Sequence, residues 1–254
     1  MSGEWANYLA FGVVKPEKMS LTLKYWGGRG LMEVPRVMLA IAGKFPDVDY
    51  VDGRFSEPPE GLEANLGRMP VVTSGSASIG QSVAINYFIA AENGLLGANN
   101  VEAAQILAIA EHIKEMRTAY SGLVPWGAEP SPESDVWFTG GASDLTGTAD
   151  RAGQKTRYLQ WWTGRIEATL DSRGFAVGSK LSLADVLLFN AYGEVLAADQ
   201  AADDFPAYRR EPFGSKEKTD AILAKFPKVA ASVNAVASNA NVKKWLAMRG
   251  KQGF

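Results

Sequence analysis

The sequence predicts an α/β first half followed by an all-helical second half. Between residues 21 and 92, short runs with strand character alternate with segments in which apolar residues recur at helical spacing. Beyond residue 100 the periodic segments all have helical spacing. Apolar residues make up 46% of the 254 residues, enough for the core of one large or two modest domains. We therefore expect two units joined by a short linker at residues 95–100.

The first half is expected to begin with a strand at residues 21–26. This run is β-branched, aromatic and apolar, and it ends at a glycine-rich loop. Residues 31–42 have apolar side chains at helical spacing, and Gly43 ends this helix as a C-cap. Residues 48–51 alternate as a short strand does. Residues 55–66 contain prolines and predict an irregular segment with one helical turn at most.

A two-strand hairpin is predicted next. Residues 67–72 and 77–79 are its strands, and residues 73–76 form a turn that is either of this length or one residue longer. Ser82 then stands at the N-cap position of a helix, ahead of an apolar run that ends at Phe88. The order β-α-β-(α)-β-β-α combines a parallel crossover with an antiparallel pair, and it predicts a small mixed sheet.

The second half contains helical patterns and two long loops. The expected helices are residues 101–122, 151–170, 186–196, 221–236 and 242–248. The loop at residues 127–148 is rich in Gly, Ser, Pro, Asp and Glu and is either a surface loop or partly disordered. The loop at residues 199–218 is charged and aromatic. Ser182 and Asp185 form a variant of the capping box, with Asp in place of the usual Glu.

Composition excludes several kinds of chemistry. The chain has no cysteine and a single histidine, His112, which excludes disulfides, a thiolate nucleophile and a multi-histidine metal site. No metal is therefore expected. The net charge is −2 without long basic runs, so no nucleic-acid partner is expected either. A catalytic group must then be a Tyr, Ser, acidic or basic side chain, or belong to a ligand.

The sequence offers no candidate for membrane insertion. No apolar stretch approaches the roughly 20 residues that a spanning helix needs, so we expect no membrane partner. Residues 1–20 contain a short apolar piece preceded by Glu4, without a basic region before it, and are a poor secretory signal. We expect an N-terminal extension there and a cytoplasmic location.

Five motifs, in order along the chain, resemble those of the cytosolic glutathione transferases. They are Leu-Lys-Tyr-Trp-(x)2-Arg-Gly-(x)2-Glu at residues 23–33, Gly67-Arg68-Met69-Pro70, Gln81-Ser82-x-Ala-Ile85, Gly178-x-x-Leu-Ser-Leu-Ala-Asp185, and Phe226-Pro227 through Trp245. The first motif is most similar to the sigma class, which is of the tyrosine type. The resemblance implies a thioredoxin-like N-terminal domain at residues 21–94 and an all-helical C-terminal domain at residues 101–250.

Tyr25 is the catalytic residue that the resemblance implies. A free thiol has a pKa of about 8.5, so only a small fraction is thiolate at neutral pH. A tyrosine hydroxyl that donates a hydrogen bond to the sulfur favours the charged form and lowers this pKa. The thiol would come from glutathione as co-substrate, which suits a chain without cysteine. Its position alone favours an ordinary aromatic residue at a strand end, and the resemblance reverses this.

The resemblance also implies how glutathione is held. Gln81 and Ser82 would bind the γ-glutamyl carboxylate at a helix N-terminus, whose free N–H groups favour an anion. The alternative is that Ser82 serves only as an N-cap. A cis bond before Pro70 would turn the Met69 backbone toward the cysteinyl backbone of the ligand.

The sequence departs from the sigma pattern at two places. The tryptophan and lysine that hold the glycine carboxylate are replaced by Glu57 and Gly61, so Arg68 is the preferred partner, with Arg54 as substitute. In the sigma class an arginine after the Arg-Gly pair adjusts the catalytic tyrosine, and this chain has Leu31 at that position. The effect of a nearby arginine on Tyr25 is therefore either weaker or supplied by Arg29. The alternative role of Arg29 is a structural ion pair.

Further site residues follow from the long helix at residues 101–122. Glu111 and Glu115 share one face, where the resemblance implies that they bind the glutathione amine of the other subunit of a homodimer; solvated surface charges are the alternative. The electrophile would contact Trp26, Tyr120 and Trp126, which are otherwise plain core aromatics. The loop at residues 127–148 is a lid or a wall, and its length prevents the substrate from being inferred by analogy.

We expect a glutathione transferase that adds the glutathione thiolate to small, mostly hydrophobic electrophiles. Two other functions fit the same sequence. One is a non-catalytic protein of this fold, such as a ligand carrier or a crystallin-like structural protein, which the missing glycine-end residues favour. The other is a glutathione-dependent isomerase.

Overall fold

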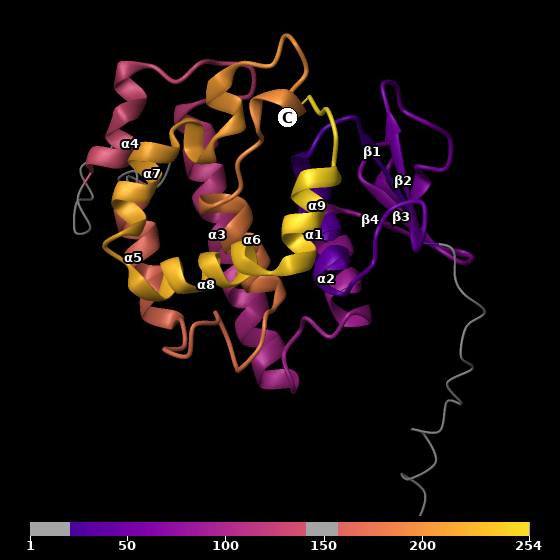
Figure 1. Cartoon of the computed structure of the whole chain (residues 1–254), viewed down its shortest axis with the longest axis horizontal. Helices are drawn as coiled ribbons and strands as arrows, with labels where there is room; N and C mark the ends of the chain where they lie inside the picture. Colours follow the sequence, from indigo (N-terminus) through magenta and orange to yellow (C-terminus); the bar gives the residue numbers. More distant parts are fainter. Residues whose placement is uncertain (1–20, 141–156, 254) are drawn as a thin grey trace, which may run out of the picture.

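A computed structural model describes residues 21–140 and 157–253. The extension expected at residues 1–20, the end of the first long loop and the start of the helix expected at residues 151–170 lie outside the described residues. The described part has an N-terminal unit with one sheet and a larger helical unit (Figure 1). None of its helices combines the length and the apolar character needed to cross a bilayer.

The sheet is mixed and has four strands, as predicted. Its strands are β1 (Leu21–Trp26), β2 (Tyr50–Phe55), β3 (Val71–Ser74) and β4 (Ala77–Gly80), in the order β2-β1-β3-β4. β1 runs parallel to β2 and antiparallel to β3, and β4 pairs antiparallel with β3. The hairpin turn consists of two residues, Gly75 and Ser76, and is shorter than expected.

The strand expected at residues 48–51 is displaced and longer in the structure. β2 continues to Phe55 through the polar residues Asp52 and Arg54. These two side chains form an ion pair at 2.9 Å, and Asp52 also binds the buried Arg36 at 2.9 Å. These ion pairs accompany the extension of the strand beyond the apolar residues from which it was predicted.

Two helices pack beside the sheet, on the side facing the helical unit (Figure 1). α1 (Glu33–Ile41) follows a short 3-10 turn at Gly30–Met32, and α2 (Ser82–Glu92) follows the hairpin. The segment between β2 and β3 contains one 3-10 turn, Glu63–Asn65, in agreement with the expectation of one helical turn.

The helical unit is built around α3 (Asn100–Leu123) and α6 (Leu183–Tyr192). The other helices are α4 (Val136–Thr139), α5 (Leu159–Thr169), α7 (Lys216–Leu223), α8 (Pro227–Ser238) and α9 (Ala240–Met248). The single helix expected at residues 221–236 is wrong. Pro227 starts a new helix because its ring fits the first helical turn and cannot continue the preceding one.

The two segments expected as loops are partly ordered. Within residues 127–140 the chain forms α4, and Trp137 is fully buried against Tyr120 and Phe213. Within residues 199–218 it forms short 3-10 turns and the start of α7. The described part of the first loop is therefore anchored in the core by an aromatic residue, which composition did not reveal.

The capping box at the start of α6 is confirmed. The Asp185 carboxylate accepts hydrogen bonds from the Ser182 N–H at 2.8 Å, the Ser182 hydroxyl at 2.7 Å, the Ala176 N–H at 2.7 Å and the Ser232 hydroxyl at 2.6 Å. Burial raises the pKa of this carboxyl above its usual range, and the four hydrogen bonds oppose that rise. Asp185 thus joins the helix start to α8.

The C-terminal helix α9 connects the two units. Glu33 of α1 accepts from the Trp245 indole N–H at 2.8 Å and pairs with Arg249 at 2.9 Å, and all three side chains are buried. The buried pairing of Glu33 with Trp245 and Arg249 fixes the first unit against the helical unit and so shapes the cleft between them.

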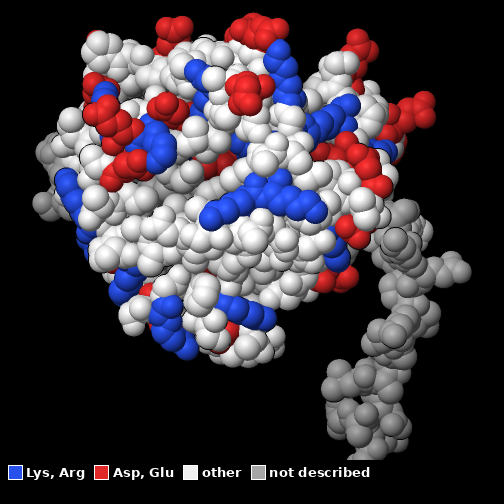
Figure 2. Space-filling model, viewed as in Figure 1, with Lys and Arg blue, Asp and Glu red and all other residues white. Residues whose placement is uncertain are grey.

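On the face in Figure 2, a row of basic side chains lies over α9, and basic and acidic groups are interspersed along the upper edge.

Candidate active site

A cleft of about 1210 Å³ lies between the two units. The first unit lines it with the end of β1, the loop that follows and the first turns of α2. The helical unit lines it with α3, the loop after α3, one side of α6 along its whole length, Glu194 beyond it, and part of the segment 208–214. Its volume exceeds that of most small-molecule pockets, so it has room for a peptide-sized ligand and a second molecule.

Tyr25 stands at the end of β1 on the wall of this cleft. Its side chain is 5% exposed, and its hydroxyl oxygen accepts a hydrogen bond from the Leu31 backbone N–H at 3.1 Å. The glycine-rich loop allows this return of the chain, since Gly30 has φ +40°, which side chains disfavour. The contact occupies a lone pair of the oxygen and leaves the hydroxyl proton free to be donated.

The protonation state of Tyr25 suits a hydrogen-bond donor. Burial raises the pKa of this phenol above its usual value, although the Leu31 N–H and the positive charges of Arg36 and Arg117 act in the opposite direction. The phenol is therefore neutral at physiological pH. A neutral hydroxyl beside cations stabilises a neighbouring anion without carrying a charge of its own.

The structure shows which groups near Leu31 and Arg29 act on Tyr25. The Leu31 backbone N–H donates to the Tyr25 hydroxyl oxygen, whereas the Leu31 side chain carries no charge that could act on Tyr25. Arg29 forms an ion pair with Glu194 at 3.1 Å and donates to the Arg209 carbonyl at 3.0 Å. Arg29 therefore has the structural role that was its alternative, and the nearby charges that lower the pKa of Tyr25 are those of Arg36 and Arg117.

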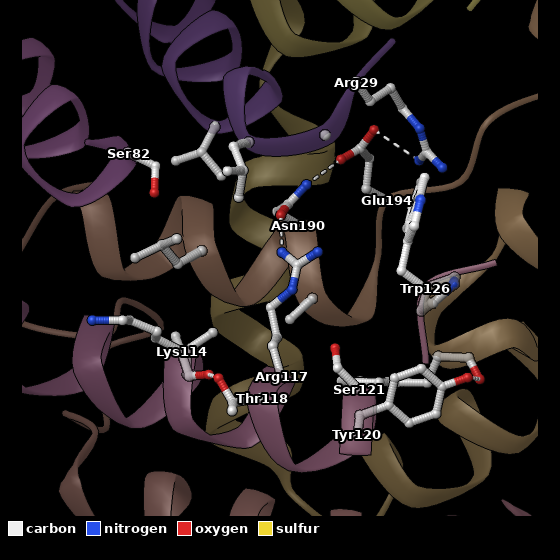
Figure 3. Close-up of a pocket in the computed structure, with 18 of the residues that line it drawn as sticks. Arg29, Ser82, Lys114, Arg117, Thr118, Tyr120, Ser121, Trp126, Asn190 and Glu194 are labelled. Carbon is white, nitrogen blue, oxygen red and sulfur yellow. Dashed lines mark hydrogen bonds and ion pairs between the residues drawn. The ribbon is translucent and has the colours of Figure 1, made fainter. Parts of the chain in front are cut away.

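The start of α2 differs from the prediction by one residue. Gln81 is the N-cap and Ser82 is the first helical residue, so the expectation that Ser82 caps the helix is wrong. Gln81 has φ +67°, a strained conformation for a residue with a side chain and one that often occurs at functional sites. Ser82 lines the cleft (Figure 3), and within residues 21–140 and 157–253 its hydroxyl has no hydrogen-bond partner.

The hairpin candidates lie outside the lining of the cleft. The Met69–Pro70 peptide bond is cis, as the resemblance implied, and the Pro70 carbonyl accepts from the Asn65 side chain at 3.1 Å. Arg68 is exposed, and its Nε donates to the Asn65 carbonyl at 3.4 Å. Arg54 is paired with Asp52 and donates to the Arg249 carbonyl at 3.4 Å. Both arginines proposed for the glycine carboxylate are thus directed at the protein's own groups.

The acidic candidates on α3 differ in position. Glu111 lines the cleft and forms an exposed ion pair with Lys114 at 3.0 Å. Glu115 is exposed and lies outside the cleft lining, as does the exposed His112.

The three aromatic candidates all line the cleft but differ in exposure. The Tyr120 hydroxyl donates to the Phe213 carbonyl at 2.7 Å, and burial raises the pKa of Tyr120 to about 12. Trp26 is partly exposed. Trp126 is 73% exposed, and the Arg209 guanidinium lies 4.6 Å from the centre of its ring. Tyr120 is therefore held by the core, whereas Trp26 and Trp126 are exposed to solvent.

The sequence did not reveal a polar chain that crosses the cleft floor. Arg117 donates to the Asn190 amide oxygen, the Asn190 amide nitrogen donates to Glu194, and Glu194 pairs with Arg29 and Arg249 (Figure 3). Glu194 is only 2% exposed. Its position in an apolar run after α6 was a usable signal for a buried ion pair. Nothing in the sequence marked Arg117 and Asn190.

Among the residues that the structure describes, no group of three or more acidic or histidine side chains is placed to hold a metal ion. The polar groups of the cleft are instead hydroxyls, guanidinium groups, amides and a few carboxylates. This donor set suits an anionic or zwitterionic organic ligand.

No protein-family model matches this chain. Among curated proteins, it is 25% identical over 235 residues to "Putative glutathione S-transferase alpha-2" of Dictyostelium discoideum, covering 92% of this chain and 96% of that protein. It is 27% identical over 235 residues to "Probable glutathione S-transferase 7" of Caenorhabditis elegans, covering 89% and 95%. It is also 23% identical to "S-crystallin 4" of Enteroctopus dofleini, covering 92% and 99%.

Solved structures show the same fold. The monomeric glutathione S-transferase Na-GST-3 of Necator americanus superposes with a TM-score of 0.67 at 22% identity, covering 92% of this chain and 100% of that one. A Nu-class enzyme of Haemonchus contortus superposes with a TM-score of 0.62 at 24% identity, covering 93% and 100%. The chain therefore has the glutathione S-transferase fold, a thioredoxin-like domain followed by a helical domain, and its homologues at low identity include proteins named glutathione S-transferases.

Proposed function

We propose that this protein is a glutathione transferase of the tyrosine type, most similar to the sigma class. The observation that carries the proposal is the hydroxyl of Tyr25, which lies at the wall of the interdomain cleft and accepts from the Leu31 N–H. Its own proton remains available to a sulfur atom in the cleft. The names of the relatives support the same activity.

The reaction then needs few protein groups. The Tyr25 hydroxyl donates a hydrogen bond to the glutathione sulfur and stabilises the thiolate, while the thiol proton leaves to water. The sulfur electron pair forms a bond to an electrophilic carbon. The displaced electron pair goes to a leaving group or to the conjugated acceptor, which then takes a proton from solvent.

Glutathione would be held by the first unit. Ser82 and the N-terminus of α2 would bind the γ-glutamyl carboxylate, since the free hydroxyl and the helix N–H groups favour an anion. Gln81 would bind the same carboxylate, and the backbone of Met69 before Pro70 would bind the cysteinyl backbone of the peptide. Arg68 and Arg54 remain the candidates for the glycine carboxylate, although each contacts protein groups in this structure.

The second molecule would bind beside Trp26, Tyr120 and Trp126. We further propose a cytoplasmic homodimer in which Glu111 and Glu115 of one subunit approach the glutathione amine of the other. A structural neighbour is described as monomeric, so sedimentation analysis of the purified protein is the direct test.

The test of the catalytic role is Tyr25→Phe, assayed by conjugation of glutathione to a model electrophile. We expect kcat/KM to fall about 10- to 100-fold, the value of a hydrogen bond to a charged group. The pH midpoint of the rate should also rise toward the pKa of free thiol, about 8.5. Tyr87→Phe, at an exposed position on α2, is the matched control. Unchanged conjugation by Tyr25→Phe would contradict the mechanism.

A non-catalytic role is the second candidate, because a relative of this chain is named S-crystallin and neither arginine proposed for the glycine carboxylate lines the cleft. A protein that binds glutathione on an affinity resin yet conjugates no electrophile would favour this role. A glutathione-dependent isomerase would need the same Tyr25 and differs only in the second substrate.

A further inference from the structure

The basic side chains that line the cleft differ in how their charges are neutralised. Within the described ranges, Arg29 is paired with Glu194, Lys114 is paired with Glu111, and Arg209 lies over the ring of Trp126. Arg117 has neither a carboxylate within ion-pair distance nor an aromatic ring beneath it in that part of the chain. Its protein contact is one neutral oxygen of Asn190.

This guanidinium is held in place. Asn190 accepts from Arg117 with its oxygen and donates to Glu194 with its nitrogen, so the two opposite partners fix the orientation of the amide. One Nη of Arg117 makes this contact, while the Nε and the other Nη have no protein partner within the described residues. Figure 3 shows the side chain extending from α3 across the cleft toward Asn190, and away from Lys114.

The surroundings of Arg117 carry excess positive charge. The connected network contains five guanidinium groups, on Arg117, Arg29, Arg249, Arg36 and Arg54, against three carboxylates, on Glu194, Glu33 and Asp52. The Arg117 side chain is exposed to the cleft, and the protein atoms around it lower its pKa, an effect that the charge of Glu194 opposes. An exposed guanidinium without a carboxylate partner is available to form charge-assisted hydrogen bonds with an anionic ligand.

The position of Arg117 favours the second substrate over glutathione. Arg117 and Tyr120 are three residues apart on α3 and share one helix face, on the side of the cleft where Trp126 lies. Ser82, at the proposed carboxylate site of glutathione, lies on the opposite wall (Figure 3).

We infer that the second substrate is an electrophile with an apolar body and a carboxylate, and that the free side of the Arg117 guanidinium binds this carboxylate. This inference rests on the proposed transferase function and specifies its substrate class. Asn190 is a positioning residue for Arg117. Trp126, whose side chain lines the same cleft, lies beside the apolar body of the substrate.

The test compares an anionic electrophile with its neutral ester. Ethacrynic acid and its methyl ester share one reactive centre, so the ratio of their kcat/KM values measures recognition of the carboxylate. For the wild-type protein we expect the acid to be preferred at least tenfold after correction for the spontaneous reaction, and Arg117→Gln to lower the ratio tenfold or more. Arg117→Lys should restore part of the preference, since it keeps the charge but loses the planar fork.

Lys114→Gln is the matched control. It removes a cationic side chain one turn away in the same cleft, but one that Glu111 already neutralises, so the ratio should change less than about twofold. Turnover of the ester shows that each variant is folded. The KM for glutathione should stay within about twofold in Arg117→Gln.

Three results would overturn the inference. An unchanged acid-to-ester ratio in Arg117→Gln means that the guanidinium does not bind the substrate carboxylate. A raised KM for glutathione with an equal loss for both electrophiles assigns Arg117 to glutathione itself. Failure of the wild-type protein to conjugate either compound refutes the proposed function and the inference with it, whereas turnover of the ester alone leaves the transferase function standing.

Discussion

Glu194→Gln perturbs the buried group that joins the two units. The Glu194 carboxylate binds Arg29 at 3.1 Å, Arg249 and Asn190, and it is 2% exposed. An amide of the same size keeps one acceptor but removes the negative charge between two guanidinium groups. Breaking a buried ion pair on one side costs about 3–5 kcal/mol, because the remaining charges are left without compensation.

The assay is urea-induced unfolding followed by tryptophan fluorescence at fixed protein concentration. We expect Glu194→Gln to lower the free energy of unfolding by about 3–5 kcal/mol at neutral pH. Glu111→Gln is the matched control, since the Glu111–Lys114 pair is exposed and contributes about 0–1 kcal/mol. A loss below about 1 kcal/mol in Glu194→Gln, equal to that of the control, would refute the view that this carboxylate holds the units together.

The same residue predicts an acid dependence. Burial acts to raise the pKa of Glu194, but the charges of Arg29 and Arg249 outweigh it and the pKa is lowered. A lowered pKa contributes stability above the unfolded value of about 4.3, and that stability is lost as the pH falls toward the folded value. The wild-type protein should therefore lose stability in acid more steeply than Glu194→Gln. Parallel acid profiles of the two proteins would contradict this.

The remaining predictions concern the core and the cleft wall. Asp185→Ala should lower the free energy of unfolding by about 3–5 kcal/mol, because it leaves the donors of Ser182, Ser232 and Ala176 without their acceptor, whereas Asp199→Ala at an exposed position should change it little. Urea midpoints decide between these outcomes. Trp137→Ala should cost about 3–5 kcal/mol, because a fully buried ring against Phe213 is lost; a cost under about 1 kcal/mol would mean that α4 is not part of the core. The pKa of Tyr120 is raised to about 12 by burial, so its contribution to stability is complete below pH 10 and is lost as the pH rises toward 12. Alkaline unfolding followed by the ultraviolet absorbance of tyrosinate should show this loss in the wild-type protein and less of it in Tyr120→Phe; identical curves would contradict the assignment.

Some of the site was predictable because it depends on local patterns. Tyr25 stands at a strand end before a glycine-rich turn, and both features are read directly from neighbouring residues. The capping box of Ser182 and Asp185 is likewise a contact between residues three apart. The prediction failed where a distant partner decides the conformation. Asp52 stays in β2 through its pairing with Arg36, and hydrophobic periodicity does not detect such a partner.

The sequence by itself determined the alternation of strands and helices, the absence of a thiol and the placement of Tyr25 and Ser82 at element ends. Periodicity reports which face of an element is buried, and spacing reports contacts within one turn. Only the tertiary structure decided what meets across the cleft. Arg117, Asn190 and Glu194 are joined because α3 packs against α6, and Arg29 reaches Glu194 over 165 residues of chain. These contacts depend on the relative placement of whole elements, which no local pattern encodes.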